Sequence, residues 1–390
     1  SSFYYLAGMV ESNATLVLVN GVNGPSTTIF CASKNKLQEI WHGRRLGVDA
    51  APDVLMIDQA YSNESLADKL IDLLDDASQV VYSFSRADTG ELVQQSLSML
   101  RRLARQGKIC PTQLADLDPL VNAMRLFKSE AEVAQMTAAC AISVTAHKRA
   151  MSVCKVGMHE YQLAAELHHQ FTTQGSQRLA YGSIVAGGEN ACILHYTNND
   201  QVLQDGDLVL IDAGCELDHY ASDITRTFPV NGRFSEAQKT IYELVLAAHE
   251  AALACIKPGA VYTDMQDAAV KVITQGLIEI GLLTGELEQN IEQQTFRKFY
   301  MHNIGHWLGM DVHDVGVYKL DGASRPLIAG MVTTVEPGIY IDPEDLDIAP
   351  QWRGIGVRIE DNILVTDHGY RNLTANLPVS VADIETIMAS

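Results

Sequence analysis

The stretch LVLIDAGCELDHYASDITRTFPV, residues 208–230, holds two apolar runs on either side of a polar turn, and it carries Asp212 and Asp223. Apolar, β-branched runs that flank polar residues predict a β-hairpin. A turn centred on Leu217 and Asp218 would place the two aspartates opposite each other, with Cβ atoms roughly 4.5–5.5 Å apart. Like charges at that separation repel, so the hairpin predicts a bound cation.

A second pair of carboxylates repeats this pattern with a longer loop. Glu336 lies in MVTTVEPGIYI (residues 331–341) and Glu360 in GVRIEDNILV (residues 356–365). A single Asp or Glu is usually a cap, a turn residue or a surface charge. Asp212, however, ends the apolar run LVLI, and a buried carboxylate is costly unless it is paired or bound to metal. Four carboxylates balance two divalent cations, which predicts a dinuclear site.

The segment MHNIGHWLGMDVHD (residues 301–314) adds His302, His306 and His313, and glycines lie close to His306 on both sides. Oxygen-rich ligation with one imidazole predicts Mn²⁺, Co²⁺ or Zn²⁺ rather than a soft metal that prefers thiolates. Two such ions can share a water, lower its pKa and polarise a carbonyl group, which predicts a hydrolase. His195, in ILHYTNN (residues 193–199), is as consistent with an ordinary surface-loop histidine as with a site residue.

Composition narrows the classes of function. A 390-residue chain with 47% hydrophobic residues predicts a two-domain globular protein, with domains at 1–120 and 121–390. The net charge of −20 argues against nucleic acid and membrane partners. Seven cysteines without a CxxC pair predict free thiols and a cytoplasmic location. The chain begins without an initiator methionine, so the first domain is potentially truncated at its start.

The two domains differ in pattern. The first alternates strand-like runs (15–19, 27–31, 53–57 and 79–85) with helical ones (64–76 and 91–107), which predicts an α/β domain with a junction at 117–128. From Ser129 the order becomes helix, helix, carboxylate hairpin, and it occurs twice. Capping boxes predict the starts of three of these four helices: Ser129 with Glu132, Ser235 with Gln238, and Thr263 with Gln266. The remaining helix, which is the second in chain order, is expected near 159–174. This order predicts a pseudo-twofold duplication around one site.

Taken together, the motifs resemble those of bacterial Xaa-Pro aminopeptidases (aminopeptidase P), metallopeptidases whose pita-bread fold is shared with prolidases, creatinase and methionine aminopeptidases. The resemblance covers the whole chain, including IWHGRRLGVDAAP in the first domain and MRLFKS at the junction, and its other motifs are ILHYTNN, LVLIDAGCE, SDITRTFPVNG, GHWLGMDVHDVG, TVEPGIY and GVRIEDNILVT. It implies an α/β N-terminal domain followed by an α+β pita-bread catalytic domain.

The resemblance also implies a division of the metal ligands. Asp212 would chelate one metal ion, while His306 and Glu336 would bind the other. Asp223 and Glu360 would bridge the two ions. A hydroxide held between the ions would attack the scissile carbonyl group.

The remaining roles rest on the resemblance as well. The catalytic set would be Glu336 as proton shuttle, His313 as the group that stabilises the tetrahedral intermediate, and His195, His302 and Arg358 around the substrate. Tyr340 and Arg358 would form the wall near the proline. Trp41 would reach the active site of another subunit in a homodimer or homotetramer, although a buried core tryptophan is an equal alternative.

The activity expected from the resemblance is Mn²⁺-dependent removal of an N-terminal residue that precedes proline, with Zn²⁺ or Co²⁺ as alternative metals. The tertiary amide of an Xaa-Pro bond has no N–H to donate, so it needs a dedicated pocket. One alternative is a prolidase restricted to dipeptides, for which Arg358 could clamp the free carboxylate. Another is a non-catalytic pita-bread protein that binds peptides, although such a protein would have no need of four clustered carboxylates.

Overall fold

The computed structural model describes residues 1–22 and 24–389, and the chain forms two compact units, Ser1–Ala123 and Met124–Ser390. The unit division falls inside helix α6 (Asp118–Leu126). The predicted domain boundary after residue 120 lies in the same helix, and as a boundary between independently folding domains it stays a prediction.

The first unit is an α/β domain, as the sequence predicts. Strand β2 (Gly24–Cys31) pairs antiparallel with β1 (Thr15–Gly21) and parallel with β3 (Gln59–Ser62), while β4 (Gln79–Tyr82) and β5 (Gln113–Asp116) form a parallel pair. Its helices before α6 are α1 (Ser2–Ala7), α2 (Lys36–His42), α3 (Ala51–Leu55), α4 (Leu66–Leu74) and α5 (Ala87–Arg102).

The strand predicted at residues 53–57 is wrong, because most of that run belongs to helix α3. Pro52 lies in the first turn of α3, where the fixed φ of proline suits a helix start. The strand that pairs with β2 begins two residues after the predicted run, at Gln59.

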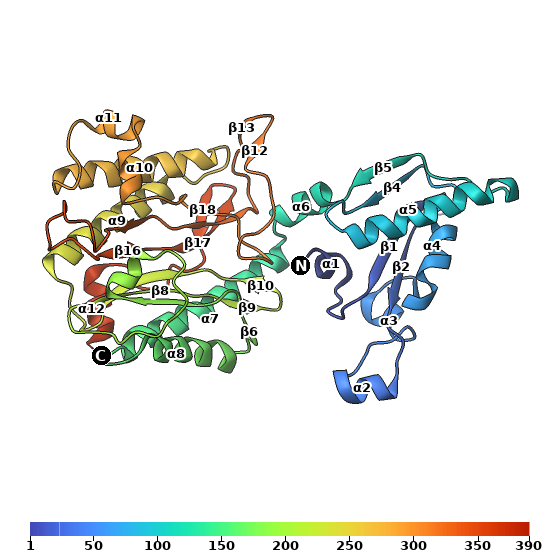
Figure 1. Ribbon diagram of the computed structural model, residues 1–390, viewed down its shortest axis with the longest axis horizontal. Helices are drawn as coiled ribbons and strands as arrows, with labels where there is room; N and C mark the ends of the chain where they lie inside the picture. Colours follow the sequence, from blue (N-terminus) through green and yellow to red (C-terminus); the bar gives the residue numbers. More distant parts are fainter. Residues whose placement is uncertain (23, 390) are drawn as a thin grey trace. The chain divides into compact units, whose positions relative to one another are not determined.

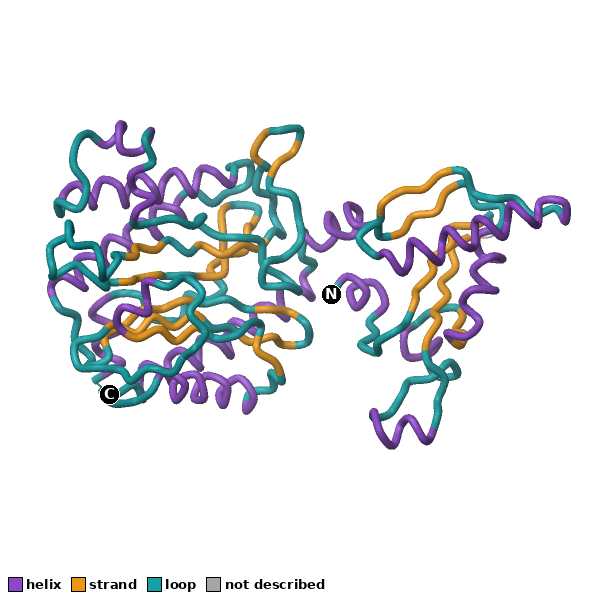
Figure 2. The backbone as a smooth tube through the Cα atoms, in the orientation of Figure 1, coloured by secondary structure: helices purple, strands orange, loops and turns teal. Residues whose placement is uncertain are grey.

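The second unit places its strands between two layers of helices (Figures 1 and 2). Helices α7 (Glu130–Val153) and α8 (Glu160–Thr173) precede strands β8 (Leu208–Asp212) and β11 (Thr225–Pro229). Helices α9 (Glu236–Ala254) and α10 (Tyr262–Glu279) precede β14 (Val332–Val335) and β17 (Asp361–Thr366). The predicted repetition of helix, helix and hairpin is therefore confirmed.

Shorter elements complete this unit: β6 (Arg178–Leu179), β7 (Ile184–Gly187), β9 (Cys215–Leu217), β10 (Tyr220–Ala221), β12 (Lys319–Leu320), β13 (Ala323–Ser324), β15 (Gly338–Tyr340), β16 (Gly356–Arg358), β18 (Gly369–Asn372), α11 (Leu287–Glu292) and α12 (Val381–Met388). The three-stranded sheets of this unit are antiparallel, in the orders β10-β9-β6, β11-β8-β7 and β14-β17-β18.

The capping boxes at Ser129 and Ser235 are confirmed, since each hydroxyl accepts the backbone N–H of the residue three positions on. The box predicted at Thr263 is wrong. The observed cap is Val261, two residues before the predicted one, and the Asp264 carboxylate accepts the N–H of Val261. Gln266 is used elsewhere, because its Oε1 accepts the N–H of Ile304 at 2.6 Å.

One large hydrophobic core runs through the second unit and packs α7–α10 against the strands. All seven cysteines are free, as the sequence predicts. Within residues 1–22 and 24–389, no helix is long and apolar enough to cross a membrane.

Candidate active site

The first carboxylate hairpin has a different register from the predicted one. Asp212 pairs with Thr225, and Tyr220 pairs with Leu217. The turn therefore lies at Asp218 and the following His219, which have φ values of 45° and 70°. Consecutive positive φ values are typical of a type I′ hairpin turn. The prediction that Asp212 faces Asp223 is thus wrong by two residues, but an even shift keeps both side chains on the same face.

The second pair of carboxylates does lie face to face. Val335 pairs with Asp361 on one side of the pair, and Gly338 pairs with Arg358 on the other. Both pairings share one register, which places Glu336 opposite Glu360. The predicted repetition of the carboxylate pair on a longer-looped hairpin is confirmed.

Thr225 joins the two hairpins, and Tyr181 joins the two carboxylates of the first hairpin. Thr225 and Glu360 form an isolated antiparallel bridge, and the Thr225 hydroxyl donates to Glu360 Oε2 at 2.7 Å. The Tyr181 hydroxyl lies 2.6 Å from Asp212 Oδ1 and 2.5 Å from Asp223 Oδ1. Sequence reasoning missed Tyr181 and Thr225, because neither stands in a pattern that distinguishes it from its neighbours.

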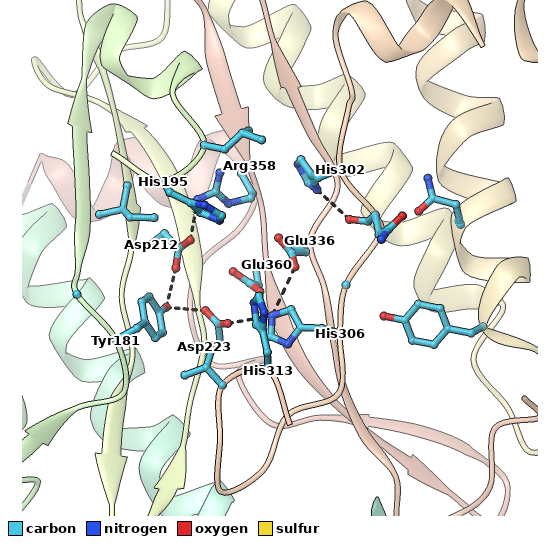
Figure 3. A pocket seen from close by; sticks show the side chains of 18 of the residues that line it. Tyr181, His195, Asp212, Asp223, His302, His306, His313, Glu336, Arg358 and Glu360 are labelled. Carbon is cyan, nitrogen blue, oxygen red and sulfur yellow. Dashed lines mark hydrogen bonds and ion pairs between the residues drawn. The ribbon is translucent and has the colours of Figure 1, made fainter. Parts of the chain in front are cut away.

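The carboxylates open into a cavity of about 830 Å³. Nine of the side chains predicted from the sequence line it (Figure 3): His195, Asp212, Asp223, His302, His306, His313, Glu336, Arg358 and Glu360. Tyr340 lies buried behind Arg358 and His302. Trp41 belongs to the first unit, on helix α2, where its side chain is 79% exposed. The alternative of a buried core tryptophan is therefore wrong.

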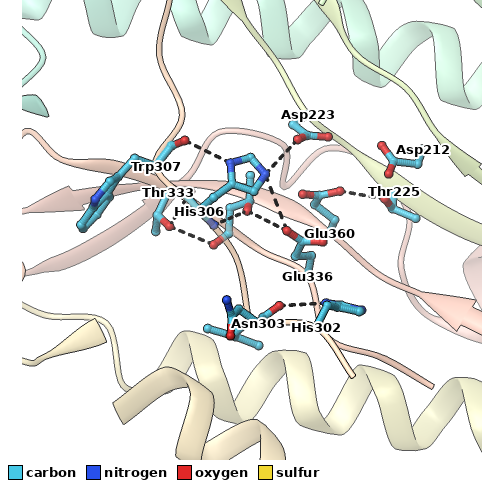
Figure 4. Close-up of polar contacts among 12 residues, drawn as sticks. Asp212, Asp223, Thr225, His302, Asn303, His306, Trp307, Thr333, Glu336 and Glu360 are labelled. Carbon is cyan, nitrogen blue, oxygen red and sulfur yellow. Dashed lines mark hydrogen bonds and ion pairs between the residues drawn. The ribbon is translucent and has the colours of Figure 1, made fainter. Parts of the chain in front are cut away.

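His306 is oriented for ligation through Nε2 (Figure 4). Its Nδ1 lies 3.0 Å from the Trp307 carbonyl oxygen, so Nδ1 carries the hydrogen in the neutral ring. Its Nε2 faces Asp223 Oδ2 at 3.3 Å and Glu336 Oε1 at 3.6 Å. The other ring nitrogen of a metal-binding histidine usually donates in this way to a carbonyl or carboxylate.

Burial and mutual repulsion perturb the acidic groups. Burial raises the pKa of Glu336 to about 7, although the neighbouring His306 opposes the shift. Burial, followed by the charges of Asp223, Glu336 and Asp212, holds the pKa of Glu360 well above its usual range. Burial opposes the charged form of His306 as well, but its hydrogen bond to Asp223 and the charge of that carboxylate outweigh it and raise the pKa of His306 to about 9.

This donor set fits divalent cations. Asp223, His306 and Glu360 each offer a ligand atom within 4.8 Å of the others. Glu360 Oε1 is buried and has no hydrogen-bond partner in the described part of the chain. Carboxylates that repel each other in a buried site are stabilised in their ionised form by a bound cation.

A chain of hydrogen bonds backs the cavity wall. Arg358 donates from Nη2 to Asp212 Oδ2 at 2.7 Å and from Nη1 to the Tyr340 hydroxyl at 3.0 Å. His302 Nε2 lies 2.8 Å from that hydroxyl, and its Nδ1 faces the Asn303 carbonyl oxygen at 2.8 Å. Nδ1 therefore carries the hydrogen, and Nε2 accepts from Tyr340. Burial lowers the pKa of His302 to about 4, which keeps the ring neutral.

His313 is placed by a buried ion cluster. The adjacent Asp314 accepts from Arg125 at 2.5 Å and from Lys128 at 3.1 Å. The His313 ring centroid lies 4.1 Å from that of His306. Burial, followed by the charge of His306, lowers the pKa of His313. The result is a neutral imidazole beside the carboxylates.

The fold and this donor set are those of a metallopeptidase. The family model described as "Metallopeptidase family M24" matches residues 134–367, and the chain belongs to that family. The model "Aminopeptidase P, N-terminal domain" matches residues 1–82. Together with the relatives described next, this match places the chain among the Xaa-Pro aminopeptidases of the family.

Full-length relatives agree with this placement. The chain is 44% identical to the Xaa-Pro aminopeptidase of Escherichia coli, over 100% of this chain and 88% of the relative. It is 35% identical to human Xaa-Pro aminopeptidase 3, over 99% and 76%. Among solved structures, Pseudomonas aeruginosa aminopeptidase PepP matches with a TM-score of 0.97 and 47% identity, over 100% of this chain and 88% of that one. A variant of E. coli aminopeptidase P in complex with substrate matches with a TM-score of 0.96, 44% identity and the same coverage.

Proposed function

We propose that this protein is a metal-dependent Xaa-Pro aminopeptidase, which releases the first residue of peptides whose second residue is proline. The observation that carries the proposal is the convergence of four carboxylates and His306 on one cavity, in a chain that belongs to an aminopeptidase family throughout its length.

We assign five side chains to two divalent ions. Asp212 would hold one ion, His306 and Glu336 the other, and Asp223 and Glu360 both. The oxygen-rich donor set with one imidazole favours Mn²⁺. When bound, the ions supply a water of lowered pKa and a Lewis acid for the scissile carbonyl group.

The remaining steps fall to the chain's own groups. Glu336, whose carboxylate lines the cavity beside His306, is assigned as the proton shuttle. A neutral His313 can donate its N–H to the oxygen that becomes negative in the tetrahedral intermediate. His195 is assigned to the substrate on its place in the cavity lining. His302 holds the Tyr340 hydroxyl at the wall assigned to the proline.

Arg358 supports an aminopeptidase rather than a dipeptidase. All three of its guanidinium nitrogens already have partners, which are Asp212, Tyr340 and the Thr225 hydroxyl. The Asp212 carboxylate already pairs with the guanidinium charge, so a dipeptide carboxylate would have to share that charge with it. The arrangement therefore favours Arg358 as a support for Asp212 and for the proline wall.

We extend the proposal to assembly and location. Leu37, Ile40 and Trp41 lie on α2 at spacings that bring them to one helix face, and each is at least 71% exposed. This apolar face supports a homodimer or homotetramer in which Trp41 contacts another subunit, and light scattering of Trp41→Ala against wild type tests it. Seven free cysteines support a cytoplasmic location.

Metal removal tests the central proposal. The protein is treated with a chelator, and release of the free first residue is followed by mass spectrometry with an Xaa-Pro-Yaa peptide and a matched Xaa-Ala-Yaa peptide. We expect no release from the metal-free protein, and recovery with Mn²⁺ for the proline peptide alone. Full activity without metal, or equal cleavage of both peptides, would contradict the proposal.

A further inference from the structure

The loop that carries His195 lacks regular secondary structure. It follows β7 and a 3₁₀ turn at Gly188–Cys192, and it runs through residues 193–201. His195 lines the cavity from this loop (Figure 3), and it is exposed. A side chain on an irregular segment is only as well placed as the contacts that hold the segment.

Glu160 provides those contacts. It is the first residue of α8, is completely buried, and accepts four hydrogen bonds from the chain around His195. Its Oε1 accepts the N–H of Gly187 at 2.7 Å and the side-chain amide of Asn190 at 3.0 Å. Both donors precede His195 in the chain.

The other oxygen holds the loop on the far side of His195. Glu160 Oε2 accepts the Tyr196 hydroxyl at 2.8 Å and the N–H of Gln201 at 3.0 Å. Tyr196 is the next residue after His195 and is buried, whereas His195 faces the cavity. One carboxylate therefore ties down the chain before and after His195.

The local sequence is built around this carboxylate. A Cβ at Gly187 would lie 3.3 Å from Glu160 Oε1 and 2.5 Å from the Leu203 side chain, so a larger residue would push the strand end away. A fully buried carboxylate costs free energy unless its oxygens are hydrogen-bonded, and here every contact goes to the segment 187–201. The Glu160 carboxylate therefore holds this loop in place as well as starting helix α8.

We infer that Glu160 is a positioning residue for the peptidase reaction: its carboxylate fixes the segment 187–201 and thereby places His195 against the substrate. This inference rests on the proposed function of the cavity. Glu160 itself does not contact the cavity, and it acts on the substrate only through His195.

Glu160→Gln is the sharpest substitution. Each oxygen of the Glu160 carboxylate accepts two hydrogen bonds, one of them from a backbone N–H. Whichever way the glutamine amide is turned, its NH₂ group replaces one of these oxygens and faces two donors that have lost their acceptor. A buried donor without an acceptor is costly, so the loop shifts. Glu166→Gln is the matched control, because it makes the same change on the same helix, where the contact is an exposed ion pair with Arg149.

With an Xaa-Pro-Yaa peptide we expect Glu160→Gln to lower kcat about 10–100-fold, as misplacement of a reacting group by about 1 Å does. Mn²⁺ affinity by calorimetry should stay unchanged, since no metal-site residue contacts Glu160. The decisive comparison is a double-mutant cycle with His195→Ala. If Glu160 acts through His195, Glu160→Gln has no further effect on kcat in the His195→Ala background. Equal losses of kcat in both backgrounds, or equal losses in Glu160→Gln and Glu166→Gln, would overturn the inference.

Hydrogen–deuterium exchange gives a readout that does not depend on activity. Glu160→Gln should raise exchange in residues 187–201 and leave the rest of α8 protected, while Glu166→Gln should leave both unchanged. Tyr196→Phe removes one of the four bonds and should give a smaller effect in the same segment, which keeps the test available if Glu160→Gln folds poorly. Unchanged exchange of 187–201 in both variants would refute the positioning role even if the protein proved not to cleave Xaa-Pro peptides, an outcome that would refute the proposed function separately.

Discussion

Gly305→Ala tests whether close backbone packing sets the position of His306. An added Cβ would lie 2.2 Å from the Thr334 carbonyl oxygen, whereas real Cβ contacts are essentially never shorter than 3.0 Å. The two segments must therefore separate by about 0.8 Å, the difference between these distances. One segment carries Gly305 and then His306, and the other carries Thr334 and then Glu336. Two hydrogen bonds between His306 and Thr334 join them.

A displacement close to 1 Å at reacting groups costs about 10²-fold in rate, so we expect kcat/KM to fall by about that factor. Overpacking should also lower the free energy of unfolding by about 1–3 kcal/mol. The assay is peptide cleavage at saturating Mn²⁺, with thermal unfolding measured alongside. Gly90→Ala is the control, because its Cβ would meet nothing closer than 3.6 Å, within helix α5. Wild-type kcat/KM for Gly305→Ala would refute this account of how His306 is held.

Three further predictions follow from the site and its surroundings. Asp223→Asn and Glu360→Gln should each lose one of two bound Mn²⁺ ions in metal analysis, because a neutral amide bridges two cations poorly, and two ions at normal affinity would contradict bridging. His313→Ala should lower kcat by about 10²-fold at unchanged metal content, and an unchanged kcat would make it a structural histidine. Burial lowers the pKa of His147 from 6.5 to about 4, so the unfolded state binds a proton first as the pH falls. Stability linked to His147 is complete above pH 6.5 and falls between pH 6.5 and 4, by about 2 kcal/mol at pH 5, and His147→Gln should flatten that part of the denaturant-derived stability profile.

Much of the site could be predicted because its residues lie in strong local patterns. Asp212 ends an apolar strand, Glu336 directly follows strand β14, and Glu360 directly precedes strand β17. Two of the three predicted capping boxes form with the residues expected. The register of the first hairpin was not predictable in the same way. Asp218 and His219 adopt positive φ values without the glycine that usually marks a type I′ turn.

The contacts that support the site were harder to predict, because they join residues far apart in the chain. Tyr181 reaches Asp223 across 42 positions, and Thr225 reaches Glu360 across 135. No local pattern marks either residue. Glu160 stands at the start of a helix, where a carboxylate is common because it interacts favourably with the helix dipole. Its position in the sequence therefore gives no sign of its contacts with the His195 loop.

The most direct test of the account is the ratio of kcat/KM for a matched pair of substrates, Xaa-Pro-Yaa and Xaa-Pro, measured on the Mn²⁺-loaded enzyme. An aminopeptidase leaves the site open beyond the proline, and the charge of Arg358 is already paired with that of Asp212. We expect faster release of the first residue from the tripeptide. Preferential cleavage of the dipeptide would contradict it and would make the protein a prolidase.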